Sequence, residues 1–109
     1  MQELKLKDLE YVDGYKEVIE EYKYKDIIIP EGFMFDGASI PKYLRWRFDP
    51  FDPRWIRAAC IHDRLYYTHE KPRKICDKIL REVMLEDGSP KRTAWEFYYG
   101  VRLFGGSHY

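Results

Sequence analysis

The stretch AACIHDRLYY, residues 58–67, decides how the rest of the chain is interpreted. Its small and apolar residues recur with helical spacing, and together with the flanking sequence they predict one helix over about residues 53–69. On this helix His62 and Tyr66 share a face, while Asp63 projects about 100° away from His62. An imidazole, a carboxylate and a phenol are costly to bury among apolar side chains without hydrogen-bond partners. We therefore expect other parts of the chain to bring partners to this helix.

Further helices are expected on both sides of the central one. Asp52 as the N-cap, with Pro53 at the first helical position, predicts where the central helix begins. Ser39 is placed to cap a short helix before it, and apolar stripes predict later helices over about Arg73–Leu85 and Lys91–Phe104. The expected inner face of the last helix carries Trp95, Tyr98, Tyr99, Arg102 and Leu103.

The first third of the chain carries the patterns of β-strands. Residues 3–12 alternate apolar and charged side chains, and Asp13-Gly14 is a hairpin-turn signal. Residues 15–24 fit a strand or a short helix, and the preceding turn and the alternation at Tyr22 and Tyr24 favour a second strand. The β-branched run 27–29 is interpreted as a third. We therefore expect an α+β fold, in which a small N-terminal antiparallel sheet packs on three to four C-terminal helices.

Length and composition fit a single domain of residues 1–109, with mainly strands in residues 1–36 and mainly helices in residues 40–104. The 19 basic and 19 acidic residues cancel, which argues against general nucleic-acid binding. No run approaches the ~20 apolar residues of a membrane span, and no signal-peptide pattern opens the chain. We therefore expect a protein that is made in the cytoplasm and has no membrane span.

Two smaller features of the composition also carry predictions. Cys60 and Cys76 fall on helical apolar faces without metal-binding spacing, which favours buried free thiols over a disulfide. The chain has no Asn and a single Gln, Gln2, while Lys and Glu are abundant. This composition is typical of proteins from thermophiles.

The strongest candidate catalytic group is His62 with Tyr66 and Asp77. A histidine acts as a general base near neutral pH when a carboxylate holds its ring and stabilises the imidazolium. Neighbouring residues of a helix diverge, so Asp63 cannot easily reach the ring of His62, whereas Asp77 on an antiparallel neighbouring helix can. The alternative is a buried hydrogen-bond network that holds the fold together and catalyses nothing.

Asp63 would then be available to bind a divalent cation, calcium or zinc, with Asp36 as a second carboxylate. Gly37 and Ser39 complete the supporting loop after Asp36. A zinc site is less favoured than calcium, because the usual spacing to a second histidine is missing. Ser39 is also a candidate nucleophile, but its position as a helix cap explains it, and the chain has no Gly-x-Ser-x-Gly elbow.

Aromatic side chains in the helical region fit either a hydrophobic core or a stacking platform for carbohydrates or bases. Core packing is the favoured interpretation, because these residues recur at helical spacing. The group comprises Tyr43, Trp46, Phe48, Trp55, Trp95, Phe97, Tyr98 and Tyr99.

Several motifs occur together in an order that resembles a family of phage and prophage proteins, the domain-of-unknown-function family numbered 1353. They are DGASIP at residues 36–41, HDxLY at residues 62–66, Asp77, and RLFG at residues 102–105. The resemblance covers nearly the whole chain from about residue 15. It implies a phage or prophage gene and hence synthesis in a host cytoplasm, with association with a virion as one option, but it implies no particular activity.

A second, local resemblance is to the secretory phospholipases of the A-two class, which also carry a His-Asp-x-x-Tyr helix followed by an antiparallel helix with Asp. It implies that His62 activates water, that Asp63 binds calcium, and that Asp77 orients His62 with Tyr66 in a supporting hydrogen bond. The flanking cysteines and the glycine-rich calcium loop of those enzymes are absent from this sequence.

Two hypotheses of function follow. The first is a small phage-encoded hydrolase that acts on an ester or amide of the host envelope through His62. The second is a non-enzymatic phage protein, either a virion or tail component or an inhibitor of a host or defence protein, with the HDxLY motif as a structural lock. Solvent access distinguishes them, because a catalytic histidine needs an open pocket and a structural lock needs none.

Overall fold

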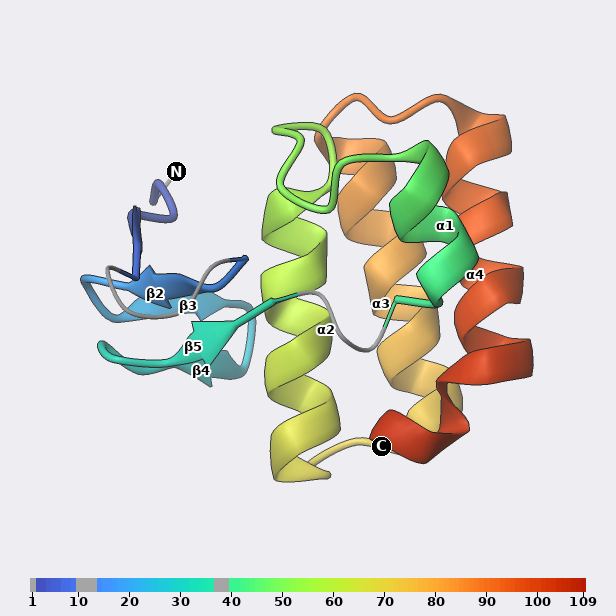
Figure 1. The fold of residues 1–109 in the computed structure, drawn as a ribbon. Helices are drawn as coiled ribbons and strands as arrows, with labels where there is room; N and C mark the ends of the chain where they lie inside the picture. Colours follow the sequence, from blue (N-terminus) through green and yellow to red (C-terminus); the bar gives the residue numbers. More distant parts are fainter. Residues whose placement is uncertain (1, 10–13, 37–39) are drawn as a thin grey trace. The chain divides into compact units, whose positions relative to one another are not determined.

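The computed structural model describes residues 2–9, 14–36 and 40–109 (Figure 1). The chain divides into two compact units, Met1–Asp36 and Gly37–Tyr109. The first contains short antiparallel strands and the second contains four α-helices, so the predicted α+β class is confirmed. That the whole chain forms a single domain stays a prediction.

The N-terminal unit holds two small antiparallel sheets. β1 (Leu6–Asp8), β2 (Lys16–Val18) and β5 (Met34–Phe35) form one sheet in the order β1-β2-β5. β3 (Tyr22–Tyr24) and β4 (Ile27–Ile29) pair as a hairpin. The predicted antiparallel pairing of the first two strands is confirmed, whereas Asp13 of the expected turn lies outside the described residues.

The prediction of one strand over residues 15–24 is wrong, because two strands of different sheets occupy this segment. After Val18 the chain leaves the first sheet, and Glu20 and Glu21 are both exposed. Two successive exposed side chains break the period of two that a continuous strand requires. Alternation resumes in the second sheet, where Tyr22 and Tyr24 are buried and the residue between them is exposed.

The C-terminal unit consists of α1 (Lys42–Arg47), α2 (Ile56–Thr68), α3 (Arg73–Glu86), α4 (Lys91–Phe104) and a short 3-10 helix, η1 (Gly105–His108). Helices α2, α3 and α4 lie side by side, with α3 in contact with both neighbours (Figure 1). None of the helices within the described residues combines the length and apolar character that crossing a bilayer requires.

The central helix begins at Ile56, three residues later than predicted, and Asp52 is not its N-cap. The Asp52 carboxylate instead accepts a hydrogen bond from the Arg54 backbone N–H at 2.8 Å and pairs with the guanidinium of the same residue. Its carbonyl also accepts the N–H of Trp55 and of Ile56. Asp52 therefore stabilises a turn of its own, and regular helical geometry starts after that turn.

The later helices have nearly the predicted bounds, but the predicted inner face of α4 is wrong. Of the expected residues only Tyr98 is buried, and Tyr99 and Leu103 are largely exposed. The buried residues of this helix are Ala94, Phe97, Tyr98, Gly100 and Val101.

Gly100 is buried on α4 because α1 packs closely against it. A Cβ atom at this position would lie 2.7 Å from Leu44 Cδ1 and 3.1 Å from the Tyr43 hydroxyl oxygen. Leu44 is fully buried, so it has no open space to move into. Helix α1 therefore rests directly on the backbone of α4.

Candidate functional site

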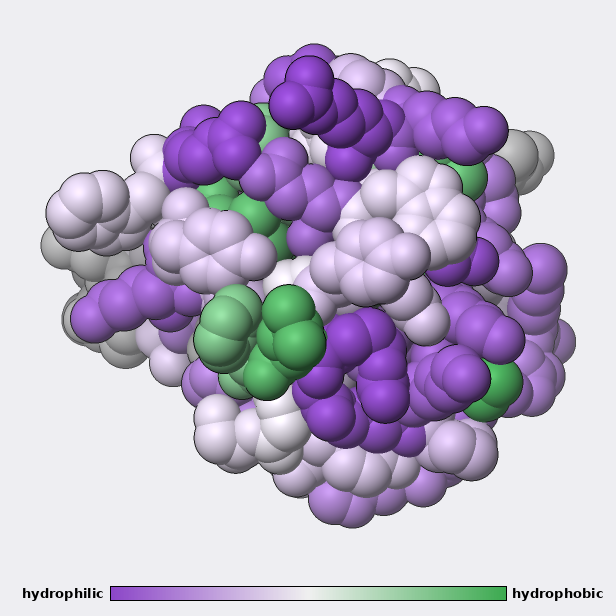
Figure 2. Space-filling model, turned by 90° about the vertical axis from the view of Figure 1, so that its right-hand side faces the viewer, coloured by the Kyte–Doolittle hydropathy of each residue, from purple (hydrophilic) through white to green (hydrophobic). Residues whose placement is uncertain are grey.

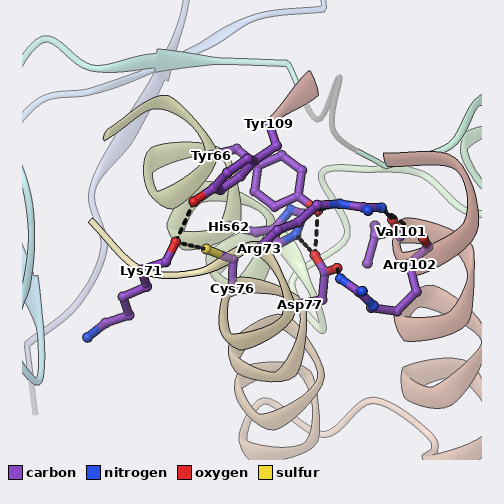
Figure 3. Close-up of polar contacts among 9 residues, drawn as sticks. All are labelled: His62, Tyr66, Lys71, Arg73, Cys76, Asp77, Val101, Arg102 and Tyr109. Carbon is purple, nitrogen blue, oxygen red and sulfur yellow. Dashed lines mark hydrogen bonds and ion pairs between the residues drawn. The ribbon is translucent and has the colours of Figure 1, made fainter. Parts of the chain in front are cut away.

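The structure brings together His62 and Tyr66 from α2 with Asp77 from α3 (Figure 3). His62 Nε2 lies 2.7 Å from Asp77 Oδ1, and the Tyr66 hydroxyl donates to the same oxygen at 2.5 Å. An ionised carboxylate only accepts hydrogen bonds, so the His62 ring carries its hydrogen on Nε2. Histidine and tyrosine meet on one oxygen because they are four residues apart on one helix face.

Two arginines complete this polar network. The second oxygen of Asp77, Oδ2, accepts a hydrogen bond from Arg102 Nη1 of α4 at 2.9 Å. Arg73 donates through Nε to the Tyr66 hydroxyl at 3.2 Å and through Nη2 to the backbone carbonyls of Val101 and Arg102 (Figure 3). Because these carbonyls lie in the last turn of α4, the Arg73 charge also interacts favourably with the helix dipole.

The C-terminal residue Tyr109 packs over the outer end of the network. Its ring meets Tyr66 edge-on at a centroid distance of 5.1 Å and stacks on His69 at 4.3 Å. The Tyr109 hydroxyl donates to the Lys71 carbonyl at 2.7 Å, in the connection between α2 and α3. The polar network and its aromatic cover thus join α2, α3 and the end of α4.

The network is sealed from solvent at its centre. The side chains of His62 and Asp77 have 0% exposed area, whereas Arg102 retains 31%. Burial raises the pKa of Asp77, but the hydrogen bonds from His62, Tyr66 and Arg102 outweigh it, and the net pKa is lowered. Burial and the hydrogen bond to Asp77 raise the pKa of the Tyr66 phenol. Asp77 is therefore ionised and Tyr66 neutral at pH 7.

The chemistry open to His62 follows from this geometry. His62 Nε2 donates to Asp77, and none of the His62 side chain is exposed to water. His62 and Asp77 have the mutual orientation of a base and its orienting carboxylate, but a substrate reaches His62 only if the helices move.

The remaining predicted site residues are Asp63, Asp36, Gly37 and Ser39, of which the structure describes the two aspartates. Asp63 follows His62 on α2 and is partly exposed, and Asp36 ends the N-terminal unit. Gly37 and Ser39 lie outside the described residues. In the described part of the chain no three His, Cys, Asp or Glu side chains are gathered to hold a metal ion. The divalent cation at Asp63 and Asp36 stays a prediction.

Both cysteines are buried free thiols. Burial raises the pKa of the Cys60 thiol well above its usual value, and it raises the pKa of Cys76 to about 11. Neither is a thiolate at neutral pH, so neither has the character of a nucleophile.

Sequence reasoning missed Arg73 and Tyr109 as members of the network. Arg102 was expected on the inner face of its helix, but without a partner. An arginine on a predicted inner face signals a buried acceptor, because a charge is rarely buried unpaired. The sequence carries no such signal for Arg73 and Tyr109. Both bind backbone carbonyls and contact Tyr66, and these partners come close to them only in the folded chain.

A second notable region is the outer surface of α1 and α4, called here the aromatic face. Its residues are largely exposed although they are apolar or aromatic, with Trp46 at 89%. Figure 2 shows apolar and aromatic side chains gathered on this side of the molecule among hydrophilic residues. The aromatic face comprises Tyr43 and Trp46 of α1, and Tyr99, Leu103 and Phe104 of α4.

The aromatic residues of the helical region therefore do not all belong to the core. Trp55, Phe97 and Tyr98 are buried, as the core interpretation predicts. Tyr43 and Trp46 are not core residues, and they line pockets on the aromatic face together with basic residues.

The fold is α+β, and the helices of the C-terminal unit are joined by a buried histidine–aspartate–tyrosine network. The profile of the family described as "Protein of unknown function (DUF1353)" matches residues 15–101, and the chain belongs to this family. It is similar to "Uncharacterized protein y4iH" of Sinorhizobium fredii (strain NBRC 101917 / NGR234), with 37% identity over 71 residues. The match covers 64% of this chain and 30% of that relative, so the chain spans under a third of the relative's length. No solved structure gave a significant match.

Proposed function

We propose that this chain is a non-enzymatic binding domain of a phage or prophage protein, in which the His62–Asp77–Tyr66 group is a structural lock. The observation that supports the lock most strongly is the complete burial of His62 and Asp77. Asp77 accepts side-chain hydrogen bonds from three residues, two on α2 and one on α4. A buried polar network that is fully hydrogen-bonded rigidifies a fold, and one that loses a member is strongly destabilised.

The partner that we propose is either another virion or tail component or a host protein that the domain inhibits. The ground for a phage origin is the motif order described above, from DGASIP to RLFG. Its test is mass spectrometry of purified particles after prophage induction. Recovery of the protein with the particles supports a virion role, and recovery only in the host cytoplasm supports an inhibitor. A gene that lies outside any prophage would contradict the phage origin.

The lock is tested by replacing His62 with Ala and measuring both urea unfolding and turnover of ester and amide substrates with calcium or zinc present. We expect a loss of roughly 3 kcal/mol in the free energy of unfolding, because the change leaves a cavity and removes a hydrogen bond to Asp77. We expect no turnover in either protein. His108→Ala is the matched control, since His108 is exposed and its replacement should leave stability unchanged.

Hydrolysis is the second candidate function, favoured by the hydrogen-bond pattern around Asp77. His62 Nε2 and the Tyr66 hydroxyl converge on one carboxylate oxygen of Asp77. The resemblance to secretory phospholipases implies that Asp77 orients His62, with Tyr66 in a supporting hydrogen bond. In this mechanism His62 takes a proton from water and Asp77 stabilises the imidazolium. If the wild type hydrolyses a substrate, and His62→Ala abolishes this turnover while the free energy of unfolding stays nearly unchanged, hydrolysis is the function and the structural lock is contradicted.

A further inference from the structure

A pocket on the C-terminal unit has the lining of a site for an organic anion. It has a volume of about 460 Å³, which is in the range of small-molecule sites. Its walls come from the segment before α1, from α1 itself, from the last residue of α4 and from η1. The lining residues are Ile40, Pro41, Lys42, Tyr43, Arg45, Phe104 and His108.

The charge of this lining has one sign. Lys42 and Arg45 are cations, His108 is a third basic group, and no acidic residue occurs among the described residues that line the pocket. Elsewhere on the same helix Arg47 does have a carboxylate partner, Glu96 of α4. The pocket therefore concentrates positive charge that an anion would neutralise.

Arg45 supplies an independent observation. Its Nε atom is buried, and no atom of the described residues accepts a hydrogen bond from it. A buried donor without an acceptor is costly, more so when it belongs to a charged group. A carboxylate or phosphate fits the planar fork of a guanidinium with paired hydrogen bonds, and the Arg45 side chain lines this pocket.

The remaining walls are apolar and aromatic. Tyr43 and Phe104 meet edge-on with ring centroids 5.8 Å apart, and both rings are largely exposed. Exposed rings beside a cationic group favour a ligand that has an apolar body as well as a charge. Inorganic phosphate alone would leave these rings uncovered.

We propose that this pocket binds a small organic anion, with its carboxylate or phosphate on Arg45 and its apolar body against Tyr43 and Phe104. The site is separate from the buried network, and the proposal does not depend on the lock. It assigns a chemical class of ligand to the part of the aromatic face formed by Tyr43 and Phe104, whereas the family description names no ligand.

Calorimetric titration of the full chain with benzoate and with phenyl phosphate tests the proposal. We expect saturable one-to-one binding of both, and at least tenfold weaker binding of benzyl alcohol, which keeps the ring and lacks the charge. Inorganic phosphate should also bind at least tenfold more weakly than phenyl phosphate. Equal binding of the neutral compound, equal binding of inorganic phosphate, or no binding of either organic anion at millimolar concentration would overturn the proposal.

Variants of the lining residues test whether the organic anions bind in this pocket. Arg45→Met should weaken both organic anions at least tenfold, whereas Arg47→Met, on the same helix but paired with Glu96, should change affinity less than twofold. Circular dichroism verifies that each variant is folded. If Arg45→Met does not fold, Phe104→Ala tests the same pocket from its other wall, and it should weaken phenyl phosphate but not inorganic phosphate. Unchanged affinity in the folded pocket variants would contradict the assignment.

Discussion

The buried network and the aromatic face use similar residue types in opposite ways. In the network, Tyr66 and Asp77 are enclosed and their polar groups are bonded to other helices. On the aromatic face, Tyr43 and Trp46 are exposed beside basic side chains. The first region is organised to hold helices together, whereas the second offers surface to a partner. Residue type alone therefore does not tell which region carries the function.

The largest expected effect is at the centre of the network. Replacing Asp77 with Ala should lower the free energy of unfolding by about 3–5 kcal/mol, because it removes the acceptor for three side chains and leaves buried donors unpaired. Urea unfolding measures the loss. Glu82→Gln on the exposed side of the same helix is the control and should change stability by less than ~0.5 kcal/mol. Equal free energies of unfolding for Asp77→Ala and Glu82→Gln would contradict the stabilising role of the buried network.

Gly100 is the position on α4 against which α1 packs. Gly100→Ala should cost about 1–3 kcal/mol, since the new Cβ would lie 2.7 Å from the buried Leu44. The change also favours the helix intrinsically, by about 1 kcal/mol, so a net loss is evidence of overpacking. Thermal unfolding measures the outcome, and a higher melting temperature would show that α1 does not rest on this backbone.

The pH dependence of stability is expected to come partly from the network. The pKa of Asp77 is lowered in the folded state, so its contribution is present above the unfolded value near ~3.9 and is lost as pH falls through the folded value. Tyr66 has a raised pKa, so its contribution is present below ~10 and is lost as pH rises further. Melting temperature should fall less steeply below pH 4 in Asp77→Asn than in Glu82→Gln. Parallel curves for these variants would contradict the assignment to Asp77.

The smallest effect is expected on the aromatic face, in spite of the size of the residue removed. Trp46→Ala should change the free energy of unfolding by less than ~0.5 kcal/mol, because 89% of the residue is exposed. Trp55→Ala is the contrasting variant and should cost about 3–5 kcal/mol, since Trp55 is buried. A large loss in Trp46→Ala would mean that the aromatic face is part of the core.

Local signals in the sequence predicted the fold class, the later helices and the pairing of His62 with Asp77. These features depend on residues a few positions apart or on neighbouring antiparallel helices, which periodicity reveals. The inner face of α4 could not be predicted from side-chain size, because α1 contacts α4 at Gly100, which packs against Leu44. The roles of Arg73 and Tyr109 depend on carbonyls and rings far away in the sequence. Such partners are known only once the helices are packed.

The central claim is that Tyr66 and Asp77 act together as a structural lock. A double-mutant cycle of Tyr66→Phe and Asp77→Asn, followed by urea unfolding, measures their coupling directly. We predict a coupling free energy of about 1–3 kcal/mol, because the Tyr66 hydroxyl donates to a fully buried carboxylate. The same cycle with Tyr67→Phe, on the exposed neighbour, should give none. Additive losses for Tyr66 and Asp77 would contradict the lock.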